Sequence, residues 1–308
     1  MEETQDDVVV IGNGLEKGPI VVAVDSSSVS SHALAEAVRI AATTGAEVYA
    51  VNYIYDEEME TFCRWLPGQK DALIAGRKSR LEKWIDELDF VKQNIKIHVS
   101  TGHPFSELTK LVSGLEPALF VIGMKGIGEE NGGHSAGYLA KACLGDGSTD
   151  VMFVRTQGDG PFRKIVVGID FSPNSRTALR KAASLAVAEG CPLYVIHIFS
   201  PNWENFGNPG DFSNDIDEYL AGLVDTFDQW IEEDLSDLKG LDASFTIRKT
   251  LDPHAGITSY ATEIGADLIV IGLVGRGHQF YRYAGSTAQK VLEGSDCSVL
   301  AVKAGFSS

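Results

Sequence analysis

The chain contains two copies of one sequence pattern, and this repeat limits the fold more than any other feature. The segment Val-Val-Ala-Val-Asp at 21–25 matches Val-Val-Gly-Ile-Asp at 166–170, an offset of 145 positions. Pro104 and Pro253 match at a slightly larger offset of 149 positions, as expected if surface loops have gained a few residues. Solenoid repeats are only roughly 20–50 residues long, so this period indicates two copies of one domain.

The length and a turn-rich segment agree with two domains. The chain has 308 residues, and a domain usually takes about 100–200 residues. The sequence Gln-Gly-Asp-Gly-Pro at 157–161 is the expected linker. We therefore predict an N-terminal extension at 1–17, a first domain at 18–157 and a second domain at 162–305. Within the extension, the apolar residues 8–11 are a candidate edge strand.

Each copy alternates short apolar runs with helical patterns. In the second copy, runs rich in β-branched residues predict strands at 164–170, 193–199, 244–249, 267–272 and 298–303. Apolar residues at helical spacing predict helices at 175–188, 216–238, 257–264 and 285–292. Strands that alternate with helices form parallel sheets through right-handed crossovers. The prediction is an α/β fold of two tandem doubly wound domains, each a five-stranded parallel sheet flanked by helices, which is a Rossmann-like architecture.

The charge balance excludes several classes of partner. There are 26 Lys and Arg residues against 43 Asp and Glu residues, a formal net charge of −17. Such a chain is repelled by nucleic acid and by anionic membranes. No apolar run approaches the roughly 18 residues of a membrane span, and the acidic start differs from a secretory signal. The four cysteines form no CxxC pair, so we expect neither a zinc site nor a disulfide framework, in a cytoplasmic protein with no membrane insertion.

The second copy has a glycine-rich segment where a ligand would bind, at the carboxyl end of a predicted strand. The segment after that strand reads Gly-x2-Gly-x9-Gly-Ser. Glycines let the backbone approach a ligand, and the free N–H groups of a helix start suit a phosphate. The arginines of this segment add positive charge, and its hydroxyls add donors. The candidate residues are Gly272, Gly275, Arg276, Arg282, Gly285, Ser286 and Thr287.

Several of these features also have purely structural interpretations. Asp170 ends a predicted strand, where it could accept bonds from ribose hydroxyls, help to hold a cation, or cap the next helix. The glycine segment could be a tight strand exit with nothing bound. His197 lies on a buried strand and is interpreted as a core histidine with its hydrogen bonds satisfied. His103 and His254 flank prolines at the mouth of the sheet and are interpreted as turn residues.

Two further features accompany the glycine motif in this duplicated frame. They are the strand-end aspartates Asp25 and Asp170 and the stretch Ala-Asp-Leu-Ile-Val-Ile-Gly at 266–272. With these features the sequence resembles the universal stress protein family over about residues 18–304. The resemblance implies a fold of the adenine nucleotide alpha hydrolase-like type and ATP as the ligand, accompanied by a divalent cation such as Mg²⁺.

The resemblance also implies roles for particular residues. Asp170 would contact the adenosine, and Ile198 would line the adenine pocket. The family pairs its domains through the last strand. Residues 151–154 and 299–302 would then join the two domains as an intramolecular pair, and the family also forms homodimers.

The first copy departs from this motif. It has glycines at 123 and 126, but Ala136 stands at the third glycine position, and Gly137-Tyr138 replaces the Ser-Thr pair. Glu129 and Glu130 lie in the spacer, where the second copy has cationic residues. Carboxylates beside a triphosphate weaken its binding. We therefore predict that the first nucleotide site is degenerate.

Three functions are compatible with these features. The first is a regulatory nucleotide-binding protein of the stress response that acts through an unknown protein partner. The second is a slow ATPase, in which Asp170, His254 or His278 would orient the attacking water. The third is a scaffold that binds no nucleotide. The sequence has no Walker lysine motif and no visible nucleophile and base pair, so regulation is favoured over catalysis.

Overall fold

The structure is a computed structural model of the chain. It describes residues 18–89, 95–102, 107, 110–111, 114–124, 149–155, 160–199, 213–273 and 286–303. Among these residues, no helix is both long and apolar enough to cross a membrane. The candidate edge strand at 8–11 and most of the linker at 157–161 lie outside the described residues, so both stay predictions.

Strands and helices alternate throughout the second half and over residues 20–101 of the first half, as predicted, and the segments between the last three strands of the first half are described only in part or not at all. The first half contains β1 (Ile20–Ala23), α1 (Ser28–Thr44), β2 (Val48–Ile54), α2 (Asp56–Trp65), α3 (Lys70–Asp86), β3 (Ile95–Thr101), β4 (Leu119–Met124) and β5 (Asp150–Arg155). The second half contains β6 (Ile165–Ile169), α6 (Pro173–Glu189), β7 (Leu193–Phe199), α7 (Ser213–Asp234), β8 (Ala243–Lys249), α8 (Pro253–Ile264), β9 (Leu268–Gly272), α9 (Ser286–Gly294) and β10 (Ser298–Val302).

The strand predictions for the second half agree with the structure to within about one residue at each end, whereas two of the four helices differ from their predicted bounds by three residues or more. The helix expected at 216–238 ends at Asp234. Leu235 and Leu238 continue the apolar pattern but lie in the turn that follows, where both are buried. The helix expected at 257–264 begins earlier, at Pro253, because Asp252 caps it. The apolar pattern thus runs past the end of α7 because the turn after it is buried, and α8 starts early because its polar first turn is capped.

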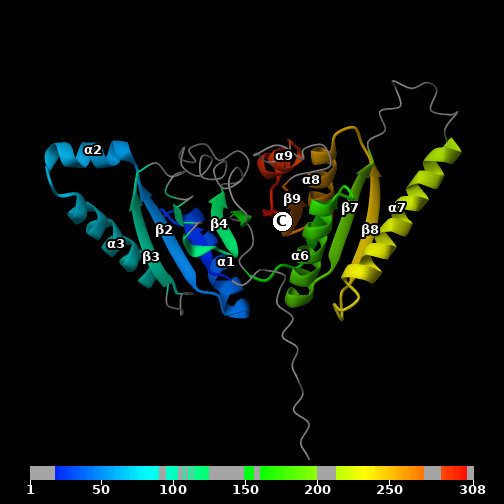
Figure 1. The fold of residues 1–308 in the computed structure, drawn as a ribbon, viewed down its shortest axis with the longest axis horizontal. Coiled ribbons are helices and arrows are strands. Elements are labelled where there is room, and N and C mark those ends of the chain that lie inside the picture. Colours follow the sequence, from blue (N-terminus) through cyan, green and yellow to red (C-terminus); the bar gives the residue numbers. More distant parts are fainter. Residues whose placement is uncertain are drawn as a thin grey trace, which may run out of the picture.

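The ten strands form one continuous sheet in the order β3-β2-β1-β4-β5-β10-β9-β6-β7-β8. Every neighbouring pair within each half is parallel. At the centre, β5 and β10 are antiparallel, with Val299 opposite Phe153 and Ala301 opposite Val151. The predicted parallel sheets and their joining through the last strands are confirmed, so the two halves form an intramolecular pair (Figure 1).

Helices cover the two faces of this sheet. One face packs on α1, α3, α6 and α7, through side chains such as Leu34, Leu81, Leu179 and Phe227. The other face of the second half packs on α8 and α9, through Ile257, Tyr260 and Val291. In Figure 1, α1 and α6 lie on either side of the centre, and α3 and α7 lie at the two outer ends. The inner strands, such as β1, β5, β6 and β10, are buried on both faces, as their continuous apolar runs require, whereas the edge strands β3 and β8 carry exposed residues.

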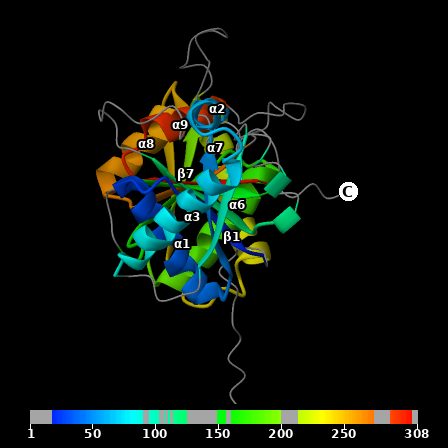
Figure 2. The ribbon, with the colours of Figure 1, turned by 90° about the vertical axis from the view of Figure 1, so that its left-hand side faces the viewer.

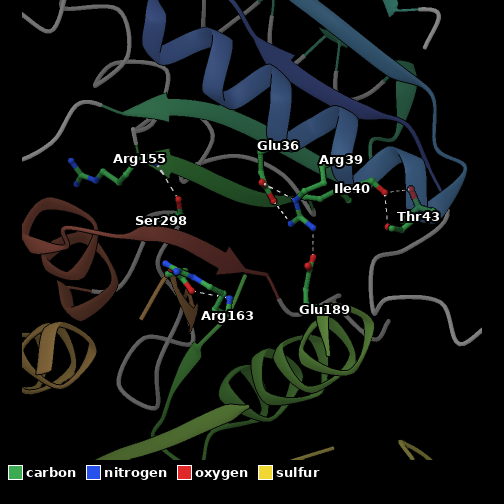
Figure 3. A network of polar contacts seen from close by, with 10 residues as sticks. Glu36, Arg39, Ile40, Thr43, Arg155, Arg163, Glu189 and Ser298 are labelled. Atoms are coloured by element: carbon green, nitrogen blue, oxygen red, sulfur yellow. Dashed lines mark hydrogen bonds and ion pairs between the residues drawn. The ribbon is translucent and has the colours of Figure 1, made fainter. Parts of the chain in front are cut away.

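Two buried ionic contacts cross the centre of the sheet. Lys181 of α6 pairs with Asp150 of β5 at 2.5 Å, and Asp150 also accepts the backbone N–H of Lys303 at 2.9 Å. Arg39 of α1 lies between Glu36 of its own helix and Glu189 at the end of α6 (Figure 3). Burial raises the pKa of Glu36, although Arg39 opposes that change through its hydrogen bond and charge. Each contact satisfies buried charge at a place where one half meets the other.

A third polar contact at the centre pairs a backbone group with a hydroxyl. The backbone N–H of Arg155 donates to Ser298 Oγ at 3.1 Å (Figure 3), and the Arg155 guanidinium donates to the carbonyl of Leu292 at 2.7 Å. Asp150 of β5 and Ser298 of β10 thus accept backbone N–H groups from each other's halves. These two backbone contacts are related by an approximate twofold axis at the centre of the sheet. The charges are not, because Asp150 is paired with Lys181 whereas its counterpart Ser298 is uncharged.

Candidate functional site

Three neighbouring strand ends bring predicted site residues together in the second half. In the register of β6 and β7, Ile169 lies opposite His197, so Asp170 lies beside Ile198. In the register of β6 and β9, Gly168 lies opposite Ile271, so Gly272 also reaches this edge. The chain runs from β6 to β7 on one side, while β9 pairs on the other side. Asp170, Ile198 and Gly272 therefore lie at the point where strand order reverses, the usual ligand position in such sheets.

Asp170 organises a turn that opens α6. Its Oδ1 accepts the backbone N–H of Ser172 at 3.0 Å, and its own N–H donates to Ser175 Oγ at 3.3 Å. Ser172 is the N-cap, and its side chain accepts the N–H of Ser175 in a capping box. The interpretation of Asp170 as the cap itself is wrong, because Ser172 holds that position. Asp170 instead holds the N-cap residue Ser172 in place by accepting its backbone N–H.

An aromatic cluster lies beneath this turn. Phe171 has φ of 57°, a left-handed conformation that is costly for a residue with a Cβ. Its ring is buried against His197, Trp230 and Phe245, with centroids 5.1, 5.2 and 6.3 Å away. Packing of the ring therefore compensates for the backbone conformation that turns the chain at the site.

His197 is a core histidine, as predicted. It is 9% exposed, and its Nδ1 lies 2.9 Å from the carbonyl oxygen of Ile169. A carbonyl oxygen can only accept, so Nδ1 carries the proton of this hydrogen bond. The ring supports the strand end next to Asp170.

Gly272 packs closely against the protein itself. A Cβ at this position would lie 3.2 Å from the backbone carbonyl group of Asn174, in the first turn of α6. In the first half, a Cβ at Gly123 would lie 2.6 Å from the carbonyl oxygen of Val29 in α1. Both glycines therefore let a strand end approach the start of a helix. This packing by itself favours a glycine at position 272, without the expected close approach of a ligand.

Ile198 presents an apolar surface at the same edge. It is half-buried, and a Cβ at Gly256 of α8 would lie 2.7 Å from its Cδ1. Gly256 thus leaves room for this side chain between β7 and α8. A partly exposed apolar side chain at a strand end has the chemistry expected of a residue that contacts a purine base.

The rest of the predicted motif is described only in part. Gly275, Arg276, Arg282 and Gly285 lie outside the described residues, as does His278. Ser286 is the first residue of α9, and Thr287 is half-buried in its first turn. The first backbone N–H groups of α9 have no acceptor within the helix, and such groups can bind an anion.

The first half repeats the turn with the same hydrogen bonds. Asp25 Oδ1 accepts the N–H of Ser27 at 3.0 Å, Ser27 caps α1, and Ser30 Oγ accepts the N–H of Asp25 at 3.3 Å. Burial raises the pKa of Asp25, but hydrogen bonds from Ser27 and Ser30 outweigh this and leave it below its ordinary value. Ser26 has φ of 64° at the position of Phe171. The sequence carried a signal for this shared turn, because Asp-x-Ser-x-x-Ser occurs at 25–30 and at 170–175.

The floor of the first site is polar, which the sequence did not predict. Asn52, at the position of His197, donates to the carbonyl of Val24 at 2.6 Å. Arg77 of α3 donates to Asn52 Oδ1 at 3.0 Å and pairs with Glu58 of α2. Tyr53, which is buried, takes the position of Ile198.

A carboxylate also lies near the mouth of the first site. Glu107 holds the position of Gly256 in the alignment that matches Pro104 with Pro253. Its carboxylate accepts from Ser100 Oγ at 2.7 Å and from Lys110 at 2.6 Å, and these bonds lower its pKa. The residues of the degenerate glycine segment, from 125 to 148, lie outside the described residues.

The structure also shows the surroundings of His254 and of two cysteines, Cys191 and Cys297. No group of three or more His, Cys, Asp or Glu side chains in the described ranges could hold a metal ion. His254, expected in a turn, lies in the first turn of α8 in contact with the N-cap Asp252, and His103 lies outside the described residues. Burial raises the pKa of Cys191 to about 11 and also raises that of Cys297, so both thiols are protonated at neutral pH.

Comparisons with known proteins agree with this architecture. The model of the universal stress protein family matches residues 18–155 and 161–303. Universal stress protein A homolog 2 of Coxiella burnetii is 30% identical over 149 residues, which are 46% of this chain and 95% of that protein. A universal stress protein of Thermus aquaticus is 28% identical over 142 residues, which are 46% of this chain and 99% of that protein. Each of these relatives is therefore about as long as one half of the chain.

A solved structure matches both halves together. The crystal structure of a universal stress protein from Archaeoglobus fulgidus DSM 4304 has a TM-score of 0.62 at 19% identity, and the match covers 94% of this chain and 100% of that one. This likeness concerns the fold. Since the two family matches cover most of the sequence, the chain belongs to the universal stress protein family and carries two family domains in tandem.

Proposed function

We propose that this chain is a regulatory nucleotide-binding protein of the stress response, with ATP held in the second half. The observation that carries the proposal is the convergence of Asp170, Ile198 and Gly272 at one edge of the sheet. In this arrangement Ile198 contacts the adenine and Asp170 binds the ribose hydroxyls. The N–H groups of α9, with Ser286 and Thr287, hold the phosphates. Gly275, Arg276, Arg282 and Gly285 complete the phosphate side.

The described residues fit an adenine nucleotide better than they fit a metal centre. The site combines an apolar side chain, a half-exposed carboxylate and a helix start, which suit the base, the sugar and the phosphates in turn. Mg²⁺ would accompany the phosphates, because the described part of the site has no ligand cluster of its own. Nucleotide binding would change a surface that a cytoplasmic protein partner binds. This regulatory role does not require hydrolysis of the nucleotide.

The first half is proposed to lack this activity. Its site has Tyr53 in place of Ile198 and Glu107 in place of Gly256, and its loop carries Glu129 and Glu130. These carboxylates oppose a polyphosphate. The expected stoichiometry is one nucleotide for each chain.

The first test is to denature freshly purified protein and identify the released nucleotides by chromatography and mass spectrometry. We expect about one ATP or ADP for each chain. Two for each chain would contradict the degenerate first site. None, together with an unchanged melting temperature in added ATP and magnesium, would favour the scaffold, because a ligand of the native state must stabilise it.

Paired variants locate the nucleotide. Gly275→Val should abolish binding, whereas Gly126→Val, its counterpart in the first half, should change the dissociation constant little. Asp170→Asn keeps an acceptor for the Ser172 N–H but removes the charge, so it should weaken binding about tenfold, as expected for a charged hydrogen bond. Asp25→Asn is the matched control. Steady phosphate release that Gly275→Val abolishes would establish the ATPase instead.

A further inference from the structure

Helix α2 contributes nothing to the core of the first half. All ten of its residues are described, and none of them is buried. The crossover from β2 to β3 is covered instead by α3, whose Leu81 and Ile85 are buried in the core. A helix as short as α2 is only marginally stable alone in water. Packing on the sheet therefore does not account for the large apolar side chains that α2 carries.

The outer side of α2 forms an apolar groove with α3. Phe62 and Trp65 of α2 and Leu73 of α3 line a cavity of about 510 Å³, together with Glu57, Glu58 and Thr61. Trp65 is 80% exposed, and the adjacent Leu66 is 51% exposed. Figure 2 looks onto this end of the molecule, with α2 and α3 facing the viewer. Exposed tryptophan and leucine side chains around one groove are typical of a protein interaction site.

The groove is acidic as well as apolar. Helix α2 carries Asp56, Glu57, Glu58 and Glu60 against a single cation, Arg64. Acidic residues in the first turn also favour the helix dipole, but Glu57 and Glu58 line the cavity itself. A second copy of this chain, with a net charge of −17, would meet repulsion here, and so would an anionic membrane. Glu58 is already paired with Arg77 of α3, so charge complementarity with a cationic occupant rests on Glu57 and on the net negative charge of α2.

We propose that the groove between α2 and α3 binds an amphipathic segment of a partner protein. That segment presents a large apolar side chain to Trp65 and Phe62, flanked by a lysine or arginine residue that faces Glu57. The contact is small, so the affinity is modest and falls with added salt. Arg77 joins Glu58 to Asn52 beneath the first site, so the bound segment lies next to that site.

The test measures binding of a short labelled helical peptide of leucine and lysine to the full chain by fluorescence anisotropy. Trp65→Ala and Glu57→Lys should each weaken binding about tenfold, the usual effect of losing a central contact. Leu251→Ser removes another exposed apolar side chain, 66% exposed and in the second half, and should leave binding unchanged. Unchanged melting temperatures of the variants would show that all of them fold.

Several results would overturn the proposal. Equal binding by Trp65→Ala and the unaltered chain would show that the peptide binds elsewhere. Equal losses in Trp65→Ala and Leu251→Ser would show that it binds exposed apolar side chains with no preference for the groove. Equal binding of a leucine and glutamate peptide would remove the charge argument. Binding of phosphatidylserine vesicles that depends on Trp65 would identify a lipid occupant. A dimer in sedimentation that Trp65→Ala dissociates would identify a second copy of the chain.

Discussion

The two halves begin their first helices with the same turn but place different side chains beneath it. Asp25 and Asp170 each accept the N–H of a serine two residues later, and that serine caps the helix. Both turns pass through a left-handed residue, Ser26 in the first half and Phe171 in the second. Below Phe171 are packed aromatic rings, whereas the first half has Asn52 bound to Arg77.

This difference shows which part of the duplicated domain is fixed by geometry and which part is free to change. The turn must satisfy the N–H groups of a helix that starts at the sheet edge, and one set of hydrogen bonds does so in both halves. The floor only has to fill space and pair its polar atoms. Aromatic packing achieves this in one half, and an amide with a guanidinium achieves it in the other.

The largest expected effect comes from breaking the aromatic floor. Phe171→Ala should destabilise the second half by about 3 kcal/mol or more, because a buried ring is lost. Phe171→Gly should cost about 1 kcal/mol less than Phe171→Ala, since glycine relieves the left-handed backbone. Ser26→Gly should instead stabilise the chain by up to about 1 kcal/mol, because no ring is lost. Urea denaturation checks all three, and destabilisation by Ser26→Gly would contradict the strain argument.

The next effect concerns the charged contacts where the halves meet. Lys181→Ala removes the ammonium group that pairs with Asp150, which is 2% exposed, and should cost about 3 kcal/mol. Ser298→Ala removes the counterpart acceptor of the other half and should cost only about 1 kcal/mol, because no ion pair is broken. The measurement is the urea midpoint of each variant. Equal losses would show that the centre of the sheet is symmetric in energy as well as in backbone contacts.

A smaller difference is expected between the two strand-end glycines. A Cβ at Gly123 would lie 2.6 Å from a backbone oxygen, so Gly123→Ala should cost about 2 kcal/mol through forced backbone movement. At Gly272 the nearest backbone atoms are 3.2 Å away, so Gly272→Ala should cost less than about 1 kcal/mol. Thermal unfolding of the two variants checks the order. If Gly272→Ala were the more damaging change, the close approach in the second half would be tighter than in the first.

The sequence predicts the strands of the sheet well because each strand is marked by a short run of neighbouring residues. Strands such as β7 and β10 are continuous apolar runs, and the repeat places each of them twice. Asp170 and Gly272 are predicted because strand ends in such a sheet meet at one edge, whereas Ile198 is predicted only from the resemblance to the universal stress protein family. The Arg77 contact with Asn52 and the Lys181 contact with Asp150 join segments far apart in sequence. Their residue types fit ordinary surface positions, so nothing local marks them.

The smallest expected effect is in the pH dependence of the first turn. Hydrogen bonds from Ser27 and Ser30 hold the pKa of Asp25 below its ordinary value despite partial burial. A lowered folded-state pKa means that ionised Asp25 stabilises the fold above its unfolded pKa, about 3.9, and that this contribution is lost as the pH falls through the folded value. Asp25 is only partly buried and much of its surface is exposed, so solvent screening keeps the contribution below about 1 kcal/mol. Asp25→Asn should therefore destabilise the chain slightly at pH 6 and not at pH 2. An NMR titration that placed the Asp25 midpoint at or above about 3.9 would contradict this account, and with it the view that the turn is held by the charged carboxylate.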